Sequence, residues 1–281
     1  MTRPQEFSIG NVKVGGDNPL FLIAGPCVIE SSTHCHFVAE QLKAITTRLQ
    51  VPFIFKASFD KANRTSLSSY RGPGLKEGLS ILKSIRDELD IPVLTDVHEV
   101  GQIEPAAQSV DCLQIPAFLS RQTDLLLAAG KSGCAVNIKK GQFLAPWDMQ
   151  HVVSKIASAG SQKILVTERG TSFGYNNLVV DMRSLAFLRT LNLPVVYDVT
   201  HSLQLPGGQG TTSGGQPQFI EPLARGGVAV GVDGMFMEVH NNPAAALSDG
   251  PNALPLDRVE ALLKQLVQID AIVKNDQRPI R

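Results

Sequence analysis

The stretch FIFKASFDKANRTS, residues 53 to 66, runs from a short apolar segment into a polar one that carries several cations. Its first part, FIFKA (53–57), is a continuous rather than an alternating apolar run, which is typical of a parallel strand covered on both faces. The later segment KEGLSILKSIRDEL (76–89) has the apolar spacing of an amphipathic helix. The stretch therefore predicts one strand–loop–helix unit, with Lys56 at the carboxyl end of the strand.

The same unit recurs along the chain. Amphipathic segments such as HFVAEQLKAITTRL (36–49) and PLDRVEALLKQLVQIDAIV (255–273) lie between further apolar runs. Eight alternations predict a (β/α)8 barrel rather than an open doubly wound sheet. We expect a single domain over residues 1–281, with FSIGNVKVGG (7–16) as a hairpin that closes the bottom of the barrel. The other predicted strands are LFLIAG (20–25), PVLTDV (92–97), CLQIPA (112–117), AVNIK (135–139), KILVTE (163–168), PVVYDV (194–199) and GMFMEV (234–239).

The composition excludes several classes of protein. Lys and Arg number 26 together, as do Asp and Glu, so no overall field favours binding to nucleic acid or to a membrane. The first ten residues lack the apolar core of a signal peptide, and no stretch has the length needed to cross a bilayer. The cysteines form no CxxC pair, which favours a reducing, cytoplasmic setting. They are Cys27, Cys35, Cys112 and Cys134.

Two nucleotide-binding motifs are absent from the sequence. The glycine-rich segment PGGQGTTSGG (206–215) contains no GK[ST] and does not predict a P-loop. No GxGxxG follows the first strand, so a Rossmann site is unsupported. We interpret residues 204–216 as a loop near the site, either mobile or a plain connection.

The active site of such a barrel is built at the carboxyl ends of its strands. Charged or metal-capable side chains are predicted at seven of these eight ends. Because charges are costly to bury unless they are paired or used, this pattern favours a functional site over a structural network. Beyond the two sets described next, the predicted ends and their loops carry Asp96, His98, Gln114, Lys140, Glu168, Asp198 and His240.

One set of these side chains is cationic. So many cations around one barrel mouth suit a substrate, or two substrates, with phosphate and carboxylate groups, because Arg offers a planar fork to such groups and Lys a compact charge. The set consists of Lys56, Lys61, Arg64, Arg121, Lys139 and Arg169.

A second set could hold one divalent transition metal. Thiolate, imidazole and carboxylate groups from three strand ends, Cys27, His201, Glu238 and Asp249, provide suitable donors, but their spacing is not that of a short metal motif. A core cysteine and a hydrogen-bonded histidine remain the alternative. The adjacent residues HCH (34–36) diverge around a helix, so we do not expect them to converge on one ion.

Several longer motifs are spread over nearly the whole chain. They are FKASFDKANRTS, SYRGPGL, IPAFLSRQTDLL, NIKKGQFLAPWD, TERGTSFGYNNLVVDMR, DVTHSLQLPGG and SDGPNALPL. These motifs resemble those of the 3-deoxy-D-manno-octulosonate 8-phosphate synthases. The resemblance implies a (β/α)8 barrel and a cytoplasmic homo-oligomer, expected to be a tetramer. It also implies a condensation of phosphoenolpyruvate with D-arabinose 5-phosphate and water in Kdo and lipopolysaccharide biosynthesis.

The resemblance also implies roles for particular residues. The phosphoenolpyruvate-binding positions are Lys56, Ser58 and Lys61 for the carboxylate, Lys139 and Arg169 for the phosphate, and Gln114 with Asp96 nearby. The arabinose 5-phosphate-binding positions are Asn63, Arg64, Thr65 and Ser66, with Arg121 reaching a neighbouring subunit. The residues expected to act in the reaction are Lys61, Asp96, His201 and Asp249.

Cys27 decides which branch of the family the chain resembles. The metal-independent branch carries Asn at this position, whereas this chain has the full set Cys27, His201, Glu238 and Asp249. The resemblance therefore implies a metal-dependent enzyme. The mixed sulfur, nitrogen and oxygen donors favour zinc, ferrous iron, cobalt or manganese.

Three other functions are weighed against this one. The related synthase that uses erythrose 4-phosphate carries KPR where this chain reads Lys61-Ala62-Asn63-Arg64. A Schiff-base aldolase could use Lys56 or Lys139 as its nucleophile. A sugar-phosphate-binding protein without turnover would need the same cations.

Overall fold

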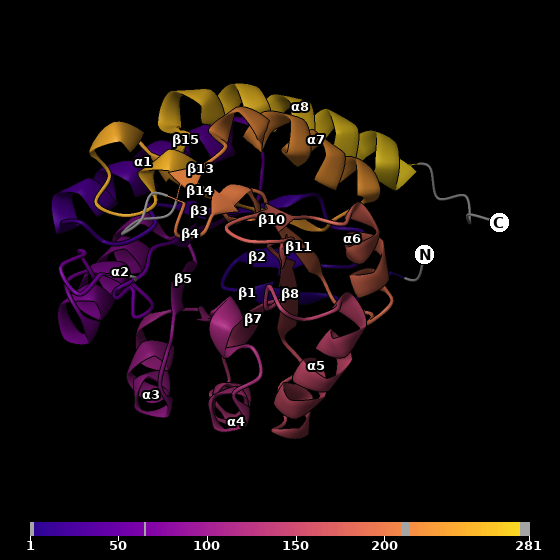
Figure 1. Cartoon of the computed structure of the whole chain (residues 1–281), viewed down its shortest axis with the longest axis horizontal. Helices are drawn as coiled ribbons and strands as arrows, with labels where there is room; N and C mark the ends of the chain where they lie inside the picture. Colours follow the sequence, from indigo (N-terminus) through magenta and orange to yellow (C-terminus); the bar gives the residue numbers. More distant parts are fainter. Residues whose placement is uncertain (1–2, 65, 209–213, 276–281) are drawn as a thin grey trace.

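The computed structural model describes residues 3–64, 66–208 and 214–275. In this part of the chain eight parallel strands form one sheet, and β14 pairs with both β3 and β11, so the sheet closes into a barrel (Figure 1). The predicted (β/α)8 barrel is therefore confirmed. The barrel strands are β3 (Phe21–Gly25), β4 (Phe53–Lys56), β5 (Val93–Asp96), β6 (Cys112–Ile115), β7 (Ala135–Lys139), β8 (Ile164–Glu168), β11 (Val195–Asp198) and β14 (Gly234–His240).

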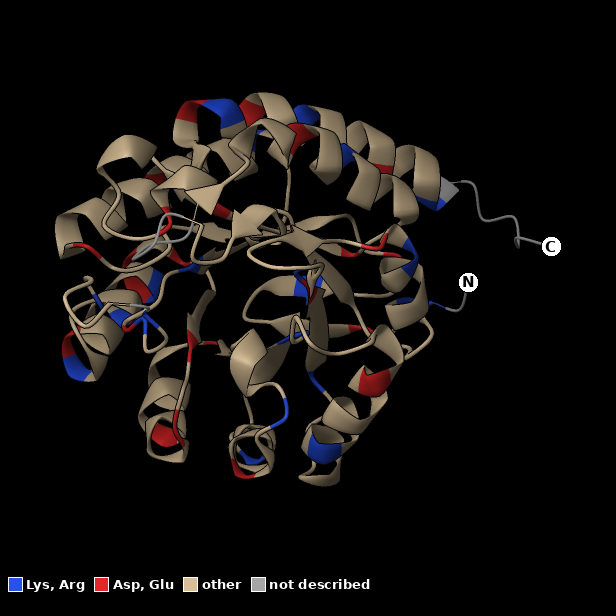
Figure 2. Cartoon of the chain, viewed as in Figure 1, with Lys and Arg blue, Asp and Glu red and all other residues tan. Residues whose placement is uncertain are grey.

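Helices surround the barrel and cover the outward face of each strand (Figure 1). Their apolar residues join one core cluster with the outward-facing residues of the strands, such as Phe55 and Val166. Lys, Arg, Asp and Glu are interspersed on the outer helices in the view of Figure 2, and no helix of the described chain is long and apolar enough to cross a membrane. The helices are α1 (Ser32–Arg48), α2 (Leu75–Leu89), α3 (Val100–Ser109), α4 (Thr123–Lys131), α5 (Met149–Ser158), α6 (Met182–Arg189), α7 (Ile220–Val230) and α8 (Leu256–Asn275).

The predicted N-terminal hairpin is also confirmed. Strands β1 (Phe7–Ile9) and β2 (Val12–Val14) pair antiparallel around Gly10, whose φ of +54° suits glycine. The buried hairpin residues pack with one or two residues from each of the eight barrel strands. This second core cluster fills the lower end of the barrel interior.

The interior of the barrel changes from apolar to polar along each strand. Since residues i and i+2 of a strand face the same side, the residue two positions after each apolar one also points inward. Leu94 is followed in this way by Asp96, and Phe236 by Glu238. The same step leads from Ile54 to Lys56, from Cys112 to Gln114, from Ala135 to Asn137, from Leu165 to Thr167 and from Val196 to Asp198.

Short elements shape the loops above the barrel. A 3-10 turn, His201–Leu203, follows β11, and another, Gly250–Asn252, follows Asp249. Within the predicted loop 204–216, Gln204–Leu205 (β12) and Gly214–Gly215 (β13) form a two-stranded ladder, while residues 209–213 lie outside the described residues. The remaining short strands are β9 (Thr171–Ser172), β10 (Leu178–Val179) and β15 (Leu254–Pro255).

Candidate active site

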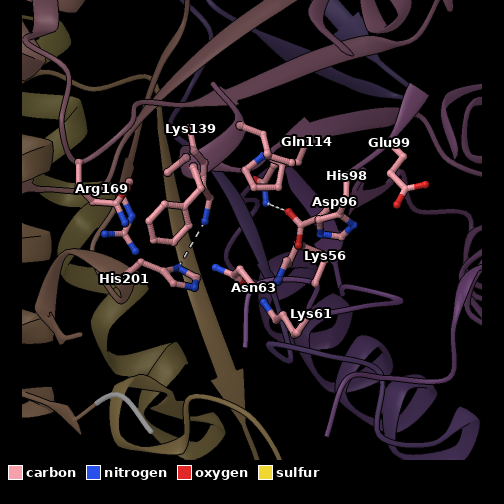
Figure 3. A pocket seen from close by; sticks show the side chains of 16 residues that line it. Lys56, Lys61, Asn63, Asp96, His98, Glu99, Gln114, Lys139, Arg169 and His201 are labelled. Carbon is pink, nitrogen blue, oxygen red and sulfur yellow. Dashed lines mark hydrogen bonds between the residues drawn. The ribbon is translucent and has the colours of Figure 1, made fainter. Parts of the chain in front are cut away.

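Two adjoining cavities open at the carboxyl ends of the strands, with volumes of about 300 and 480 Å³. Several predicted side chains from different strands point into the first cavity (Figure 3). The two cavities share Lys61, Asn63, Arg169 and His201 in their linings, so they form the two parts of one site. Predicted residues that line the first cavity are Lys56, Lys61, Asn63, Asp96, Gln114, Lys139, Arg169 and His201.

Lys56 and Lys61 converge on one buried carboxylate. The Lys56 Nζ lies 3.1 Å from Glu238 Oε1 and donates to the carbonyl of Cys27, and the Lys61 Nζ lies 3.7 Å from the same Glu238 oxygen. Burial would lower the pKa of Lys61, but the nearby Cys27, Glu238, Asp96 and Asp249 outweigh it and raise the pKa well above its ordinary value. Both ammonium groups therefore stand at the floor of the cavity, with Lys61 held in its charged form.

Lys139, Asp198 and His201 form a buried triad beside them. The Lys139 Nζ donates to Asp198 Oδ2 at 2.5 Å, and His201 Nδ1 lies 2.6 Å from the same oxygen (Figure 3 shows Lys139 facing His201). The Lys139 Nζ also lies 3.3 Å from His201 Nδ1, and the other ring nitrogen, Nε2, lies 3.3 Å from Glu238 Oε1. Burial lowers the pKa of Lys139, and Asp198 offsets this only in part. Asp198 thus acts on the imidazole that we predict as a metal ligand, a role that sequence reasoning did not assign to it.

A chain of hydrogen bonds crosses four neighbouring strands and ends at Asp96. Thr167 donates to Asn137 at 2.6 Å, and Asn137 donates to Gln114 at 2.8 Å. Gln114 then donates to one oxygen of Asp96 (Figure 3), and Ser58 donates to the other. Every amide in this chain points its NH₂ group toward the carboxylate.

The ionisation of Asp96 follows from its surroundings. Burial would raise the pKa of its carboxyl, but the charges of Lys56, Lys61, His98 and Lys139 outweigh burial and lower the pKa well below its ordinary value. Asp96 therefore stays ionised at neutral pH. As a carboxylate it can orient the neighbouring cations, or accept a hydrogen bond from a substrate hydroxyl, without taking up a proton.

Arg169 is buried and partly unpaired. Its Nη2 donates to Gln204 Oε1 at 2.7 Å, whereas its Nη1 has no hydrogen-bond partner among the described residues. The backbone of Arg169 is held by Glu168, whose Oε1 accepts from the N–H groups of residues 169 and 170 and lies 3.5 Å from Lys140 Nζ. Lys140 and Glu168 are therefore a structural pair that supports Arg169, although both stand at predicted strand ends.

Three of the four predicted metal ligands lie close together. One donor atom each from Cys27, Glu238 and Asp249 lies within 4.8 Å of the other two, and His201 Nε2 lies 3.3 Å from Glu238 Oε1. Glu238 Oε2 is buried without a hydrogen-bond partner in the described chain, and Cys27 Sγ lies 3.4 Å from Asp249 Oδ2. Burial, aided by Glu238, raises the pKa of the Cys27 thiol. An orphaned carboxylate oxygen among sulfur, nitrogen and oxygen donors fits a divalent transition metal.

The segment after β4 contributes unevenly to the site. Asn63 lines both cavities, and Arg64 lies with its Nη1 3.9 Å from Asp249 Oδ1. Ser66 bonds instead to Ser68 and is not part of either described lining, and Thr65 lies outside the described residues. The Arg121 side chain is exposed and, among the described residues, is part of neither lining.

Several residues of the site carried little signal in the sequence. The sequence predicts His98 at a strand end but assigns it no role; in the structure it lines the first cavity, and its buried Nδ1 has no partner among the described residues. Phe118 and Gln142 line both cavities from loops, and Gln204 begins β12. Nothing in the residue type or spacing of these three distinguishes them from ordinary loop residues.

The HCH segment behaves as predicted at two of its three residues. Cys35 is in the core and His36 bonds to Ser84, but the His34 ring stacks on His240, 4.5 Å between centroids, near Glu30. His240 Nδ1 accepts the N–H of residue 242, so the Nε2 of the neutral ring carries its proton toward the Glu30 carboxylate. This nitrogen therefore has no free lone pair for a metal, and the cluster is a structural one.

Known proteins resemble this chain over almost all of its length. The sequence profile of the DAHP synthetase I family matches residues 2–275. A 2-dehydro-3-deoxyphosphooctonate aldolase of Geobacter metallireducens is 61% identical over 274 residues, which cover 98% of this chain and 100% of the relative. The protein of the same name from Syntrophotalea carbinolica is 60% identical, covering 97% of this chain and 99% of the relative, and that of Geobacter sulfurreducens is 58% identical over 98% and 100%.

Proposed function

The chain belongs to the DAHP synthetase I family and, within it, to the 2-dehydro-3-deoxyphosphooctonate aldolases, and we propose that its barrel mouth condenses phosphoenolpyruvate with D-arabinose 5-phosphate and water. The family predicted from the motifs is confirmed, and the protein is an enzyme of Kdo biosynthesis. The observation that carries the proposal is the convergence of Lys56, Lys61, Lys139 and Arg169 on one cavity.

The reaction balances as follows. Carbon 3 of phosphoenolpyruvate forms a bond to the aldehyde carbon of the pentose phosphate, and the aldehyde oxygen takes up a proton. Water adds its oxygen to carbon 2, and the bond between carbon 2 and the phosphate oxygen breaks. The products are 3-deoxy-D-manno-octulosonate 8-phosphate and inorganic phosphate.

The cations suit phosphoenolpyruvate, which carries a phosphate and a carboxylate close together. We assign the carboxylate to Lys56, Lys61 and Ser58, and the phosphate to Lys139 and Arg169. The free Nη1 of buried Arg169 supports this, because an orphaned guanidinium nitrogen is costly unless an anion completes it. Holding both reactants in a reactive orientation can lower the activation barrier by up to about 7–11 kcal/mol.

Asp96 and Gln114 line the first cavity together with these cations, and we place them next to the bound pentose phosphate. The short hydrogen bonds to Asp96 hold its carboxylate in one orientation, facing the cavity beside Lys61. We assign Asp96 and Lys61 to the orientation of the reacting aldehyde and its hydroxyl neighbours. Asn63, Arg64, Thr65 and Ser66 belong to the pentose phosphate side.

Arg121 supports a homo-oligomer, since its side chain is exposed and, in the described part of the chain, lines neither cavity of its own barrel. We propose a closed assembly, a tetramer, in which Arg121 reaches the pentose phosphate of a neighbouring subunit. Sedimentation at assay concentration tests this, and a fully active monomer would contradict it.

Cys27, His201, Glu238 and Asp249 would hold a divalent transition metal such as zinc, ferrous iron, cobalt or manganese. When bound, such an ion polarises a carbonyl oxygen or lowers the pKa of a bound water. Asp198 holds the His201 ring at Nδ1, so that Nε2 faces Glu238, and Lys56 and Lys61 lie against Glu238. The chain's own residues therefore orient two of the four predicted ligands.

The decisive experiment is an assay of phosphate release from phosphoenolpyruvate with each of two aldehydes. We expect rapid release with D-arabinose 5-phosphate and slow release with erythrose 4-phosphate, because Ala62-Asn63 replaces the proline-containing motif of the related synthase. Equal rates would contradict the assignment of substrate, and no release would favour a binding protein.

The buried Lys139, with its lowered pKa, is the one observation that would suit a Schiff-base nucleophile. Its ion pair with Asp198 holds the nitrogen away from that role. Borohydride added during turnover should therefore trap no covalent adduct, and a trapped adduct would replace the proposed mechanism.

A further inference from the structure

Gln204 joins the two functional halves of the site. Its side chain accepts a hydrogen bond from Arg169 Nη2 at 2.7 Å and donates one to Asp249 Oδ2 at 3.2 Å. Arg169 belongs to the proposed phosphate site and Asp249 to the proposed metal site. We propose that Gln204 is a positioning residue that couples phosphoenolpyruvate binding to metal binding, an inference that rests on the proposed function.

The orientation of the Gln204 amide is determined by its two partners. Arginine only donates and a carboxylate only accepts, so the amide oxygen must face Arg169 and the NH₂ group must face Asp249. A rotation of the amide by half a turn would place like groups against each other on both sides. The two hydrogen bonds are therefore made together, and Gln204, with 9% of its surface exposed, has little freedom to make one without the other.

The backbone around Gln204 adds to this constraint. Its N–H donates to the carbonyl of His201, which closes the 3-10 turn that carries this predicted ligand. Gln204 also pairs with Gly215 in the β12–β13 ladder. The amide is thus attached to the same turn as one predicted ligand and hydrogen-bonded to another.

Phosphoenolpyruvate and the metal would each order a residue that helps to bind the other. An anion on the free Nη1 of Arg169 holds the guanidinium where Gln204 requires it, and Gln204 then holds Asp249 by one carboxylate oxygen. A metal that orders Asp249 acts on Arg169 along the same path. Because coupling between two binding sites is reciprocal, the metal should tighten phosphoenolpyruvate by the same factor by which phosphoenolpyruvate tightens the metal.

Direct attraction between a bound cation and an anionic substrate would also couple the two sites, without any help from Gln204. A variant must therefore separate the two contributions. Gln204→Met removes both hydrogen bonds at similar length, whereas Gln204→Glu retains an acceptor for Arg169 but places a second carboxylate against Asp249. Gln142→Met is the matched control, since Gln142 is another buried glutamine that lines both cavities, and its Oε1 has no partner among the described residues.

The test is a competition experiment with full-length, Co²⁺-loaded protein and a chromogenic chelator, with and without phosphoenolpyruvate. In the wild type we expect phosphoenolpyruvate to lower the Kd for Co²⁺ by about 5-fold or more. Gln204→Met should reduce this factor to less than half of the wild-type value, Gln204→Glu should weaken Co²⁺ even without substrate, and Gln142→Met should leave the factor unchanged. Thermal melts of all variants identify any loss through misfolding.

Two results would overturn the inference. Either a Gln204→Met factor equal to that of the wild type, or an equal loss in Gln142→Met, would show that Gln204 does not carry the coupling. Turnover of the wild type, measured in parallel, separates this from the proposed function. If the wild type releases phosphate normally but phosphoenolpyruvate does not change its Kd for Co²⁺, only the role of Gln204 is rejected. If the wild type binds no phosphoenolpyruvate, both the role of Gln204 and the proposed function are rejected.

Discussion

The two ends of the barrel interior are made by the same eight strands and differ in almost every physical respect. At the lower end, Leu94, Leu165 and Phe236 pack with the N-terminal hairpin in an apolar cluster. Two residues further along these strands, Asp96 lines the first cavity, Thr167 begins the polar chain that leads to it, and Glu238 lies against Lys56 and Lys61. A single step of the strand repeat separates a layer that stabilises the barrel from one that performs chemistry.

The difference shows how the fold tolerates its site. Buried charges contribute little to stability, because desolvation offsets their attraction, and removing one partner leaves an uncompensated charge. In the upper layer Lys56 is paired with Glu238, and Lys139 with Asp198. The lower layer and the outer helices supply the apolar burial on which the fold depends.

The largest effect should come from removing a predicted metal ligand in the upper layer. His201→Ala should lower kcat/KM more than about a hundredfold, because even partners that only support a ligand are typically worth 10–100-fold. Prolonged chelation should abolish wild-type turnover, and several divalent transition metals should restore it, but not in the variant. Phosphate release measures turnover, and elemental analysis measures the bound metal, in the wild type and in the variant.

Cys27→Asn sharpens the same test, because it introduces the residue of the metal-independent branch. We expect poor metal binding with some chelator-resistant activity, since the cations that we propose to bind phosphate are unchanged. Full-rate turnover by wild-type enzyme stripped of metal would return Cys27, His201, Glu238 and Asp249 to a structural role.

The next effect concerns the lower layer. Leu165→Ala should reduce the free energy of unfolding by about 2–5 kcal/mol through lost burial and a cavity, while the folded enzyme keeps a kcat close to that of the wild type. Thr167→Val, two residues further on the same strand, is the matched control. It removes one hydrogen bond, worth about 1 kcal/mol, at the start of the chain that leads to Asp96. Denaturant unfolding and steady-state kinetics compare the two, and a large loss of kcat in Leu165→Ala would weaken the separation of the layers.

The smallest effect is a pH dependence of stability. The pKa of Asp96 is lowered in the folded protein, so its charge stabilises the fold above the unfolded carboxyl pKa of about 3.9, and this stabilisation is lost as the pH falls toward the folded value. The difference in Tm between wild type and Asp96→Asn should be constant from about pH 7 to 5 and narrow below about pH 4. A difference that stayed constant at acid pH would show that the charge of Asp96 does not stabilise the fold.

Much of the fold and part of the site could be predicted from the sequence. Continuous apolar runs and helical periodicity predicted the strands and most helices, because parallel strands and amphipathic helices leave a local pattern. The set of cavity-lining cations followed from knowing which strand ends meet. Arg121 shows the limit of that reasoning, since a position after a strand does not say where a side chain points. Ser66, which the resemblance placed on the pentose phosphate side, bonds to Ser68 instead.

The sequence by itself determined the barrel, its hairpin and the identity of the groups at its mouth, because each depends on residue type and on spacing along one element. Only the tertiary structure decided how those groups are partnered. Whether Glu168 supports a loop or lines the cavity, whether His34 meets His240, and whether Gln204 joins Arg169 to Asp249 all depend on contacts between segments far apart in the chain. Such contacts are determined by packing at distances of a few ångströms, and a linear pattern carries no record of them.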